Sequence, residues 1–188
     1  SSDVCSSDLK KIFAALGVLF LWSCNTQQLP TGATAVTDFK QEKYLGKWYE
    51  IARLDFTFEK DMDNTMAEYA LNKDKSIKVI NSGYNYKKEK WSQVEGKAKF
   101  VGEPSIAELK VSFFGPFYAP YNVIALEGDY QYALVVGKNT DYLWILSLEK
   151  TIPNDVKKRF LALAKDLGYH IDDLVWPTHD RIRPDKID

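Results

Sequence analysis

The stretch "LGKWYEIARLD", residues 45–55, indicates how the chain folds. Gly46 predicts a tight bend, and Trp48 is too large for an edge strand that has no packing partner. From Tyr44 onward, apolar residues recur at every second position rather than every 3.6 residues, which indicates strands. We therefore interpret this stretch as the first strand of a β-rich domain.

Seven further alternating segments follow, separated by turn residues such as those at 72–75 and 115–116. Their regular spacing is typical of an antiparallel meander joined by hairpins. Eight such strands form either a two-layer sandwich or a closed barrel, and closure leaves no exposed strand edge. Small residues on the apolar side, such as Ala67 and Gly96, favour a hollow interior, although a solid core of the same residues stays open. The seven segments are residues 65–71, 76–84, 94–100, 107–114, 121–128, 132–137 and 142–148.

One amphipathic helix is predicted after the strands, over residues 153–167. Pro153 suits a first helical position, Asp155 is favourable in the first turn, and Gly168 can end the helix. A lone helix after eight strands is expected to pack against their outer wall, and residues 172–176 predict a short extra strand. The apolar stripe of the helix comprises Val156, Phe160, Leu163, Ala164 and Leu167.

The charge balance and the cysteines argue against several classes of function. The 188 residues carry a net charge of −1 and no dense basic block, so we expect no nucleic-acid partner. Both cysteines, Cys5 and Cys24, precede the strands, which leaves the domain without a disulfide, a thiol nucleophile or a thiolate metal site. The sequence has no HExxH or phosphate-loop motif, and we expect neither a metal nor a cofactor.

The N-terminal region has the features of an export signal. Lys10 and Lys11 precede an apolar run over residues 12–22, which has the length of a signal-peptide core and is too short to span a bilayer. The peptide "LWSC", ending at Cys24, resembles the bacterial lipobox, which implies cleavage before Cys24 and lipidation of that residue. Asn25 then implies sorting to the outer membrane, by the usual pattern of such lipoproteins.

Three parts of the chain are therefore expected. Residues 1–23 form an N-terminal extension and a lipoprotein signal peptide, within which residues 1–9 indicate a misplaced start or foreign sequence. Residues 24–37 are polar with Pro and Gly and predict a flexible tether, and residues 38–188 form the domain. The expected location is the periplasmic face of the outer membrane, with the lipid anchor at Cys24.

Three features together resemble the lipocalin family: Gly46-x-Trp48-Tyr49 on the first strand, Thr140-Asp141-Tyr142 before the last strand, and the late helix. Residues 113–126 and 141–147 are similar to bacterial lipocalin lipoproteins of the Blc type, and "KWYEIAR" is similar to apolipoprotein D. The resemblance implies an all-β fold: an eight-stranded antiparallel up-and-down barrel with one C-terminal helix packed outside.

The resemblance also implies that Trp48 plugs the closed end of the barrel, where Gly46 lets the chain turn in. In this family an Arg after the last strand usually stacks over the Trp, but Leu148 stands at that position here. Lys150, Arg181 and Arg183 are the candidate substitutes.

If the barrel is hollow, the apolar side of each strand lines a ligand cavity. Glu50 and Asn81 share this inward parity, and the aromatic segment 113–121 is a candidate for one rim of the mouth. The resemblance implies a fatty acid or a lysophospholipid as the ligand. The predicted lining set is Ala52, Ala67, Tyr69, Ile77, Val79, Val94, Ala98, Leu109, Val111, Phe113, Tyr121, Val123, Ala125, Tyr132, Leu134, Trp144 and Leu146.

Three functions follow from this interpretation. The first is to bind and carry or store such lipids in the bacterial cell envelope. The second is an enzyme that uses the cavity as its active site, but His170 and His179 lie outside the strands and no Ser/His/Asp set is evident, so we expect no catalysis. The third is a structural envelope lipoprotein that has no small-molecule ligand. The chain is expected to be either a monomer or a homodimer.

Overall fold

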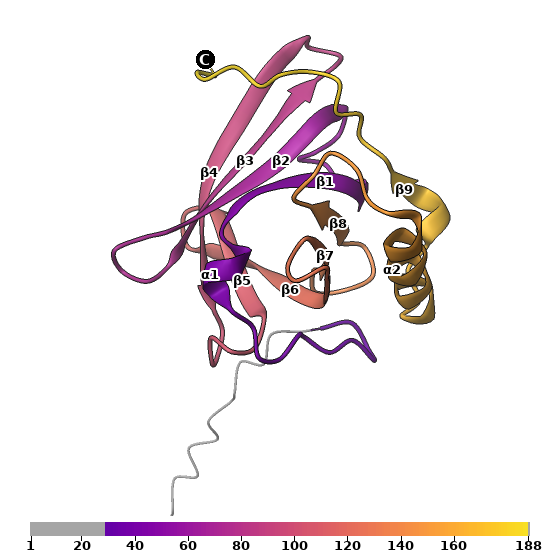
Figure 1. Cartoon of the computed structure of the whole chain (residues 1–188). Helices are drawn as coiled ribbons and strands as arrows, with labels where there is room; N and C mark the ends of the chain where they lie inside the picture. The colour runs from indigo at the N-terminus through magenta and orange to yellow at the C-terminus, as the bar shows by residue number, and fades with distance from the viewer. Residues whose placement is uncertain (1–28, 188) are drawn as a thin grey trace, which may run out of the picture.

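A computed structural model describes residues 29–187 (Figure 1). Eight antiparallel strands pair in sequence order, and β1 pairs with both β2 and β8, which closes the barrel. The predicted up-and-down barrel is thus confirmed. The strands are β1 (Gly46–Leu54), β2 (Met62–Leu71), β3 (Ile77–Asn85), β4 (Lys90–Phe100), β5 (Glu108–Phe114), β6 (Phe117–Glu127), β7 (Tyr132–Val136) and β8 (Leu143–Ser147).

The predicted helix is α2 (Asn154–Asp166), which begins after Pro153 and lies against the outside of the barrel (Figure 1). A short helix η1 (Ile171–Asp173) leads into β9 (Leu174–Val175), which pairs with β1 and confirms the predicted extra strand. One further helix, α1 (Gln41–Tyr44), precedes β1 and was not predicted.

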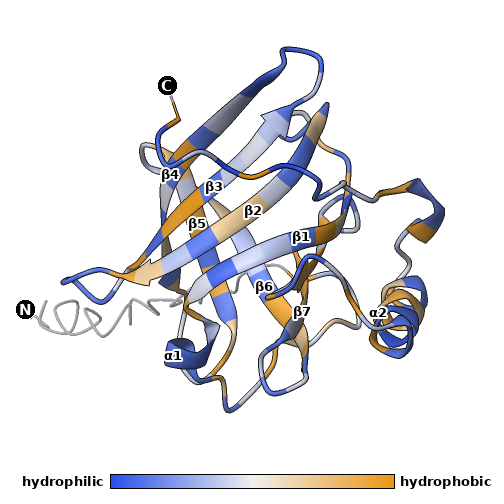
Figure 2. Ribbon diagram, turned by 45° about the horizontal axis from the view of Figure 1, so that its top comes forward, coloured by the Kyte–Doolittle hydropathy of each residue, from blue (hydrophilic) through white to orange (hydrophobic). Residues whose placement is uncertain are grey.

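An outer hydrophobic cluster joins α2 to the barrel wall. Its helical members Val156, Phe160 and Ala164 are buried, as predicted, whereas Leu163 is 36% exposed. Figure 2 shows hydrophobic and hydrophilic residues side by side along α2, as expected for a helix that covers a wall on one side. The barrel therefore has apolar residues on both sides of its wall beneath α2.

Two irregularities in strand pairing shape that wall. The register shifts between Glu50 and Ala52 in β1, and again between Val123 and Ala125 in β6. A β-bulge adds one residue to a strand, so the residues after it exchange faces. In β1, Ile51 and Ala52 both pack in the outer cluster.

The closed end of the barrel is plugged by Trp48, which is fully buried. Its indole Nε1 donates a hydrogen bond of 2.9 Å to the Tyr44 carbonyl oxygen, and the rings of Trp48 and Tyr44 lie 4.8 Å apart. The predicted substitutes do not stack here: Lys150 bonds to His179, Arg181 lies over Tyr84 and Arg183 pairs with Glu68. Tyr44 of α1 therefore supplies the packing over Trp48.

The segment before α1 is fastened to the barrel. The Val36 amide donates to the Val123 carbonyl, and the Ala107 amide donates to the Val36 carbonyl, at 2.9 Å each. The predicted tether comprises residues 24–37. Near its end, Val36 is hydrogen-bonded to the barrel through its backbone and is therefore part of the folded domain. The predicted signal peptide and Cys24 lie outside the described residues. Within residues 29–187, no helix has the length and apolar character needed to cross a bilayer.

Candidate functional site

The barrel interior holds a cavity of about 690 Å³. Its wall is formed mainly by side chains of β2 to β6 and β8, which alternate between this cavity and the outer surface. The hydrophobic side of the predicted alternation thus surrounds empty space. The predicted residues on the wall are Ala67, Tyr69, Ile77, Val79, Val94, Ala98, Leu109, Val111, Phe113, Tyr121, Trp144 and Leu146.

The structure places the other five predicted residues elsewhere. The bulges in β1 and β6 turn Ala52 and Ala125 outward, into the cluster beneath α2. Tyr132 and Leu134 also belong to that cluster, whereas Val123 is buried in the interior core and does not reach the cavity. In β7 both faces are apolar, because one meets the interior and the other meets α2, so alternation could not assign them.

Aromatic side chains surround the mouth of the cavity. Phe58, from the loop between β1 and β2, is 75% exposed, and Phe117, from the β5–β6 hairpin, is 79% exposed. The rings of Phe58 and Phe114 lie 5.9 Å apart across this opening. Tyr142, from the predicted Thr140-Asp141-Tyr142 motif, lines the cavity beside Phe56. The predicted rim segment 113–121 thus contributes several residues of the mouth.

A buried ionic cluster lies beside the cavity near the mouth. The Arg53 guanidinium is 1% exposed and donates 2.7 Å hydrogen bonds to the Glu50 carboxylate and to the Glu59 carbonyl oxygen. Thr65 Oγ1 donates to the same Glu50 carboxylate at 3.1 Å, and Trp144 Nε1 donates to the Glu59 carboxyl at 3.1 Å. The bulge in β1 explains this cluster, because it turns Arg53 inward instead of Ala52.

The two acidic side chains of this cluster share one cation. Burial raises the pKa of the Glu59 carboxyl well above its usual range, and repulsion from Glu50 raises it further. The hydrogen bond from Trp144 and the charge of Arg53 act in the opposite direction. Glu59 therefore holds its proton to higher pH than a glutamate in water does.

Sequence reasoning named Glu50 as inward but missed Arg53 and Glu59. The available signal was the pair Ile51-Ala52, two successive apolar residues that interrupt the alternation and are compatible with a bulge. Glu59 lies in the loop between β1 and β2, where alternation carries no information on which way a side chain points.

Three tyrosine hydroxyls meet at the closed end of the cavity. Tyr44, Tyr69 and Tyr121 all line it. The Tyr121 oxygen lies 2.7 Å from that of Tyr44 and 2.8 Å from that of Tyr69. The cavity therefore has polar groups at both ends and a mainly apolar wall between them.

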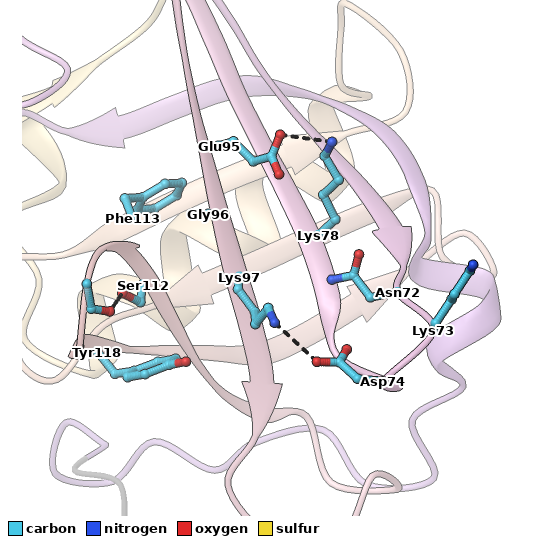
Figure 3. A pocket seen from close by; sticks show the side chains of 11 residues that line it. Asn72, Lys73, Asp74, Lys78, Glu95, Gly96, Lys97, Ser112, Phe113 and Tyr118 are labelled. Atoms are coloured by element: carbon cyan, nitrogen blue, oxygen red, sulfur yellow. Dashed lines mark hydrogen bonds and ion pairs between the residues drawn. The ribbon is translucent and has the colours of Figure 1, made fainter.

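A second, shallow depression lies beside the strands β3 to β5 (Figure 3). Its charges are largely paired: Lys78 with Glu95 at 2.8 Å, and Lys97 with Asp74 at 3.1 Å. Figure 3 shows Lys73 at the edge, directed away from both pairs. Exposed ion pairs of this kind contribute little binding energy, so the interior cavity is the stronger candidate site.

Among the residues that the structure describes, neither histidine lines the cavity. Among residues 29–187, no group of three or more His, Cys, Asp or Glu side chains is placed to hold a metal ion. His170 is exposed, and His179 Nε2 lies 2.8 Å from the Glu50 carbonyl oxygen, on the backbone of β1. The arrangement is that of a binding cavity with hydrogen-bonding groups at each end.

A closed eight-stranded antiparallel barrel around an apolar cavity is the architecture of the class of barrel proteins whose interior can hold one small ligand. Residues 39–179 match the family model described as "Lipocalin-like domain". The chain therefore belongs to the lipocalin family. The fold, the cavity and the family together support a protein that binds small hydrophobic ligands.

Several curated relatives are similar over most of the chain. "Outer membrane lipoprotein Blc" of Citrobacter freundii is 49% identical over 166 residues, which cover 88% of this chain and 94% of the relative. The Escherichia coli (strain K12) protein of the same name is 46% identical over 168 residues, covering 89% and 95%. "Apolipoprotein D" of Rattus norvegicus is 38% identical over 125 residues, covering 62% and 64%.

More distant solved structures share the fold. Insecticyanin from the tobacco hornworm Manduca sexta superposes with a TM-score of 0.63 at 21% identity, covering 80% of this chain and 86% of that structure. The cockroach allergen Per a 4 superposes with a TM-score of 0.61 at 19% identity, covering 77% and 91%. At this level of identity the likeness concerns the fold alone.

Proposed function

We propose that the protein binds and carries or stores lipids that have a long acyl chain, fatty acids or lysophospholipids, in the bacterial cell envelope. The observation that carries this proposal is the cavity of about 690 Å³ with its largely apolar wall. Pockets for small ligands typically measure about 300–1,000 Å³. Each buried methylene contributes about 0.8 kcal/mol, so a chain of about twelve supports micromolar affinity after ordering costs.

The head group of such a lipid is proposed to stay at the mouth. Among the described residues on the cavity wall, the acidic and basic ones are Glu50, Glu59 and Lys138. Glu50 is already bonded to Arg53, whereas Lys138 lies in the loop between β7 and β8 and can face a phosphate or carboxylate. A charged head group that remains in water avoids the large cost of burying an unpaired charge.

We also propose that Cys24 is lipidated and holds the protein at the periplasmic face of the outer membrane. Support comes from the lipobox-like "LWSC" and from relatives whose name is outer membrane lipoprotein. Several acyl chains on one cysteine anchor stably, whereas one chain is marginal. Mass spectrometry of the membrane-extracted protein tests this, because the lipidated form has a diacylglyceryl mass at an N-terminal Cys24.

Ligand binding is tested by titrating the protein with palmitoyl lysophosphatidylcholine. Trp144 lines the cavity, so its fluorescence reports occupancy. Saturable binding with unchanged lipid, verified by mass spectrometry, supports a carrier. Lipid turnover would instead favour an enzyme, and the absence of binding would favour a structural lipoprotein. Native mass spectrometry of the same preparation gives the oligomeric state and any co-purified lipid.

The position of the site is tested by Ala98→Trp. Ala98 is buried on the cavity wall between Ile77 of β3 and Val111 of β5. An indole at this position fills the cavity, and we expect a loss of affinity of at least ten-fold by calorimetry. Leu163→Trp on the exposed side of α2 is the matched control and is expected to bind as the wild type does. Unchanged affinity of a folded Ala98→Trp would contradict the proposed site.

A further inference from the structure

The two hydrogen bonds among three hydroxyl groups at the closed end of the cavity leave one O–H donor unused. Tyr44 of α1, Tyr69 of β2 and Tyr121 of β6 bring three hydroxyl groups together, and Tyr121 lies between the other two. Three hydroxyls carry three protons, but two oxygen–oxygen contacts use two of them. Within residues 29–187, these hydroxyls have no other hydrogen-bond partner.

One hydroxyl proton remains without an acceptor for every choice of donor and acceptor in the two hydrogen bonds. If Tyr44 donates to Tyr121 and Tyr121 donates to Tyr69, then the Tyr69 hydroxyl is free to donate. If both outer tyrosines donate to Tyr121, then the Tyr121 hydroxyl is free. Burial raises the pKa of all three hydroxyls above the usual tyrosine value, so none of them ionises near neutral pH.

The rings of these tyrosines pack in or against the interior hydrophobic cluster, and the nearest acidic groups that act on them are Glu50 and Glu59, which raise the pKa of Tyr69. Phe39, Trp48, Val79 and Leu109 belong to the same interior cluster and are buried. A buried donor without an acceptor destabilises the complex, and a plain hydrocarbon end placed against the hydroxyls leaves that donor unsatisfied. A ligand oxygen at the same place accepts a hydrogen bond from that donor and satisfies it.

We propose that the closed end is a hydrogen-bond donor subsite for an oxygen atom at the buried end of the ligand. This inference rests on the proposed lipid-binding function and deepens it. The ligand class then includes acyl chains oxygenated near the terminal carbon, such as ω-hydroxyacyl or keto-acyl lipids. A fatty acid that enters with its carboxylic acid first presents the same acceptor chemistry.

The test compares three ligands by calorimetry: palmitoyl lysophosphatidylcholine, its 16-hydroxypalmitoyl analogue, and palmitic acid. Each is titrated into the wild type and into the triple variant Tyr44→Phe/Tyr69→Phe/Tyr121→Phe. The triple variant keeps the rings and removes every hydroxyl of the cluster, a replacement of all partners that costs little stability. Tyr84→Phe, which removes a hydroxyl outside the cavity, is the matched control.

We expect the triple variant to bind the plain lysophospholipid at least as tightly as the wild type does. Its affinity for the 16-hydroxy analogue is expected to fall at least ten-fold relative to the plain ligand. If the triple variant also loses affinity for palmitic acid, the acceptor is assigned to a carboxylic acid group that enters the cavity first. If its affinity for palmitic acid is unchanged, the acceptor is assigned to an oxygen on the acyl chain. If no oxygenated ligand is weakened relative to the plain lysophospholipid, the subsite is contradicted.

A second measurement needs the wild type alone. The 9-hydroxy and 16-hydroxy isomers of the palmitoyl lysophospholipid have the same composition, but only the second can bring its oxygen to the tyrosines. We expect the 16-hydroxy isomer to bind at least ten-fold more tightly, and equal affinities would contradict the subsite. Failure of the plain lysophospholipid to bind the wild type would instead contradict the proposed function itself.

Discussion

The closed end and the mouth of this barrel are both rich in aromatic residues, but those residues are buried at the closed end and exposed at the mouth. At the closed end, Phe39 and Trp48 are 4% and 0% exposed, and they pack with Tyr44. At the mouth, Phe58 and Phe117 are 75% and 79% exposed. The closed end therefore concentrates buried apolar area, which stabilises the fold, while the mouth leaves similar area in contact with water.

The difference separates stability from access. Burial of apolar area stabilises the fold by about 25 cal/mol per Å². The aromatic rings at the mouth remain in water and therefore do not add this stabilisation. A polar contact helps to order the mouth: Arg53 ties the β1–β2 loop to the barrel wall through the Glu59 carbonyl oxygen, and Phe56 of the same loop packs against Trp144. Substitutions at the two ends should consequently change different measured quantities.

The largest expected effect is on stability at the closed end. Trp48→Ala removes a fully buried indole and should lower the free energy of unfolding by about 3–5 kcal/mol. Urea denaturation followed by far-ultraviolet circular dichroism measures this. Phe117→Ala at the mouth is the control, with an expected change within about 0.5 kcal/mol. Equal losses for both variants would remove the distinction between the two ends.

The buried cation at the mouth comes next. Arg53→Gln leaves the Glu50 carboxylate buried without its charge partner, and we expect a loss of about 3 kcal/mol in the same denaturation measurement. Arg159→Gln on α2 breaks an exposed pair with Glu127 and should cost less than about 1 kcal/mol. A loss for Arg53→Gln no greater than that of the surface control would show that the cluster does not order the mouth.

A smaller effect depends on pH. The folded state raises the Glu59 pKa, so as pH rises the unfolded chain releases this proton before the folded protein does, and stability falls. Glu59→Gln removes that loss and should be more stable than the wild type by on the order of 1 kcal/mol at pH 8.

Below the ordinary glutamate pKa of about 4.3, the wild type and Glu59→Gln should be equally stable, because both side chains are then neutral. Glu95→Gln on the exposed surface of β4 is the control and should show no comparable pH-dependent gain. A Glu59→Gln difference that stays constant from pH 4 to pH 8 would exclude this assignment.

The smallest effect is on ligand access. Phe58→Ser combined with Phe117→Ser should leave stability unchanged and slow lipid association about two- to five-fold, which is below the one to three decades over which association rates vary among mutants of one interface. Stopped-flow Trp fluorescence measures the rate. Ile182→Ser, at an exposed position on the C-terminal segment, is the control. An unchanged association rate would mean that the mouth aromatics take no part in ligand entry.

Alternation along the chain predicted the eight strands, the helix and most of the cavity wall, because each strand separates an apolar face from a polar one. It failed where one residue is inserted. The register shift after Glu50 exchanged the faces of Ala52 and Arg53, and the shift after Val123 moved Ala125 outward. Such bulges depend on the pairing of neighbouring strands, which a single sequence does not display.

Two other features could not be predicted for different physical reasons. In β7, Leu134 faces α2 and Val135 faces the interior, so both sides are apolar and their assignment depends on the tertiary packing. The partner of Trp48 is Tyr44, in a four-residue helix too short for any periodicity to indicate. The candidate substitutes after β8 were wrong because they are engaged elsewhere on the surface.

The two bulges also constrain how this chain can change during evolution. Deleting Ile51 would remove the bulge and restore simple alternation in β1, with Arg53 still facing the interior and Ala52 still facing α2. In a regularly paired part of a strand, by contrast, a length change of one residue moves every later side chain to the other face, whereas a change of two keeps the faces. Descendants of this sequence should therefore tolerate the loss of one residue at these two bulges more readily than elsewhere in β1 and β6.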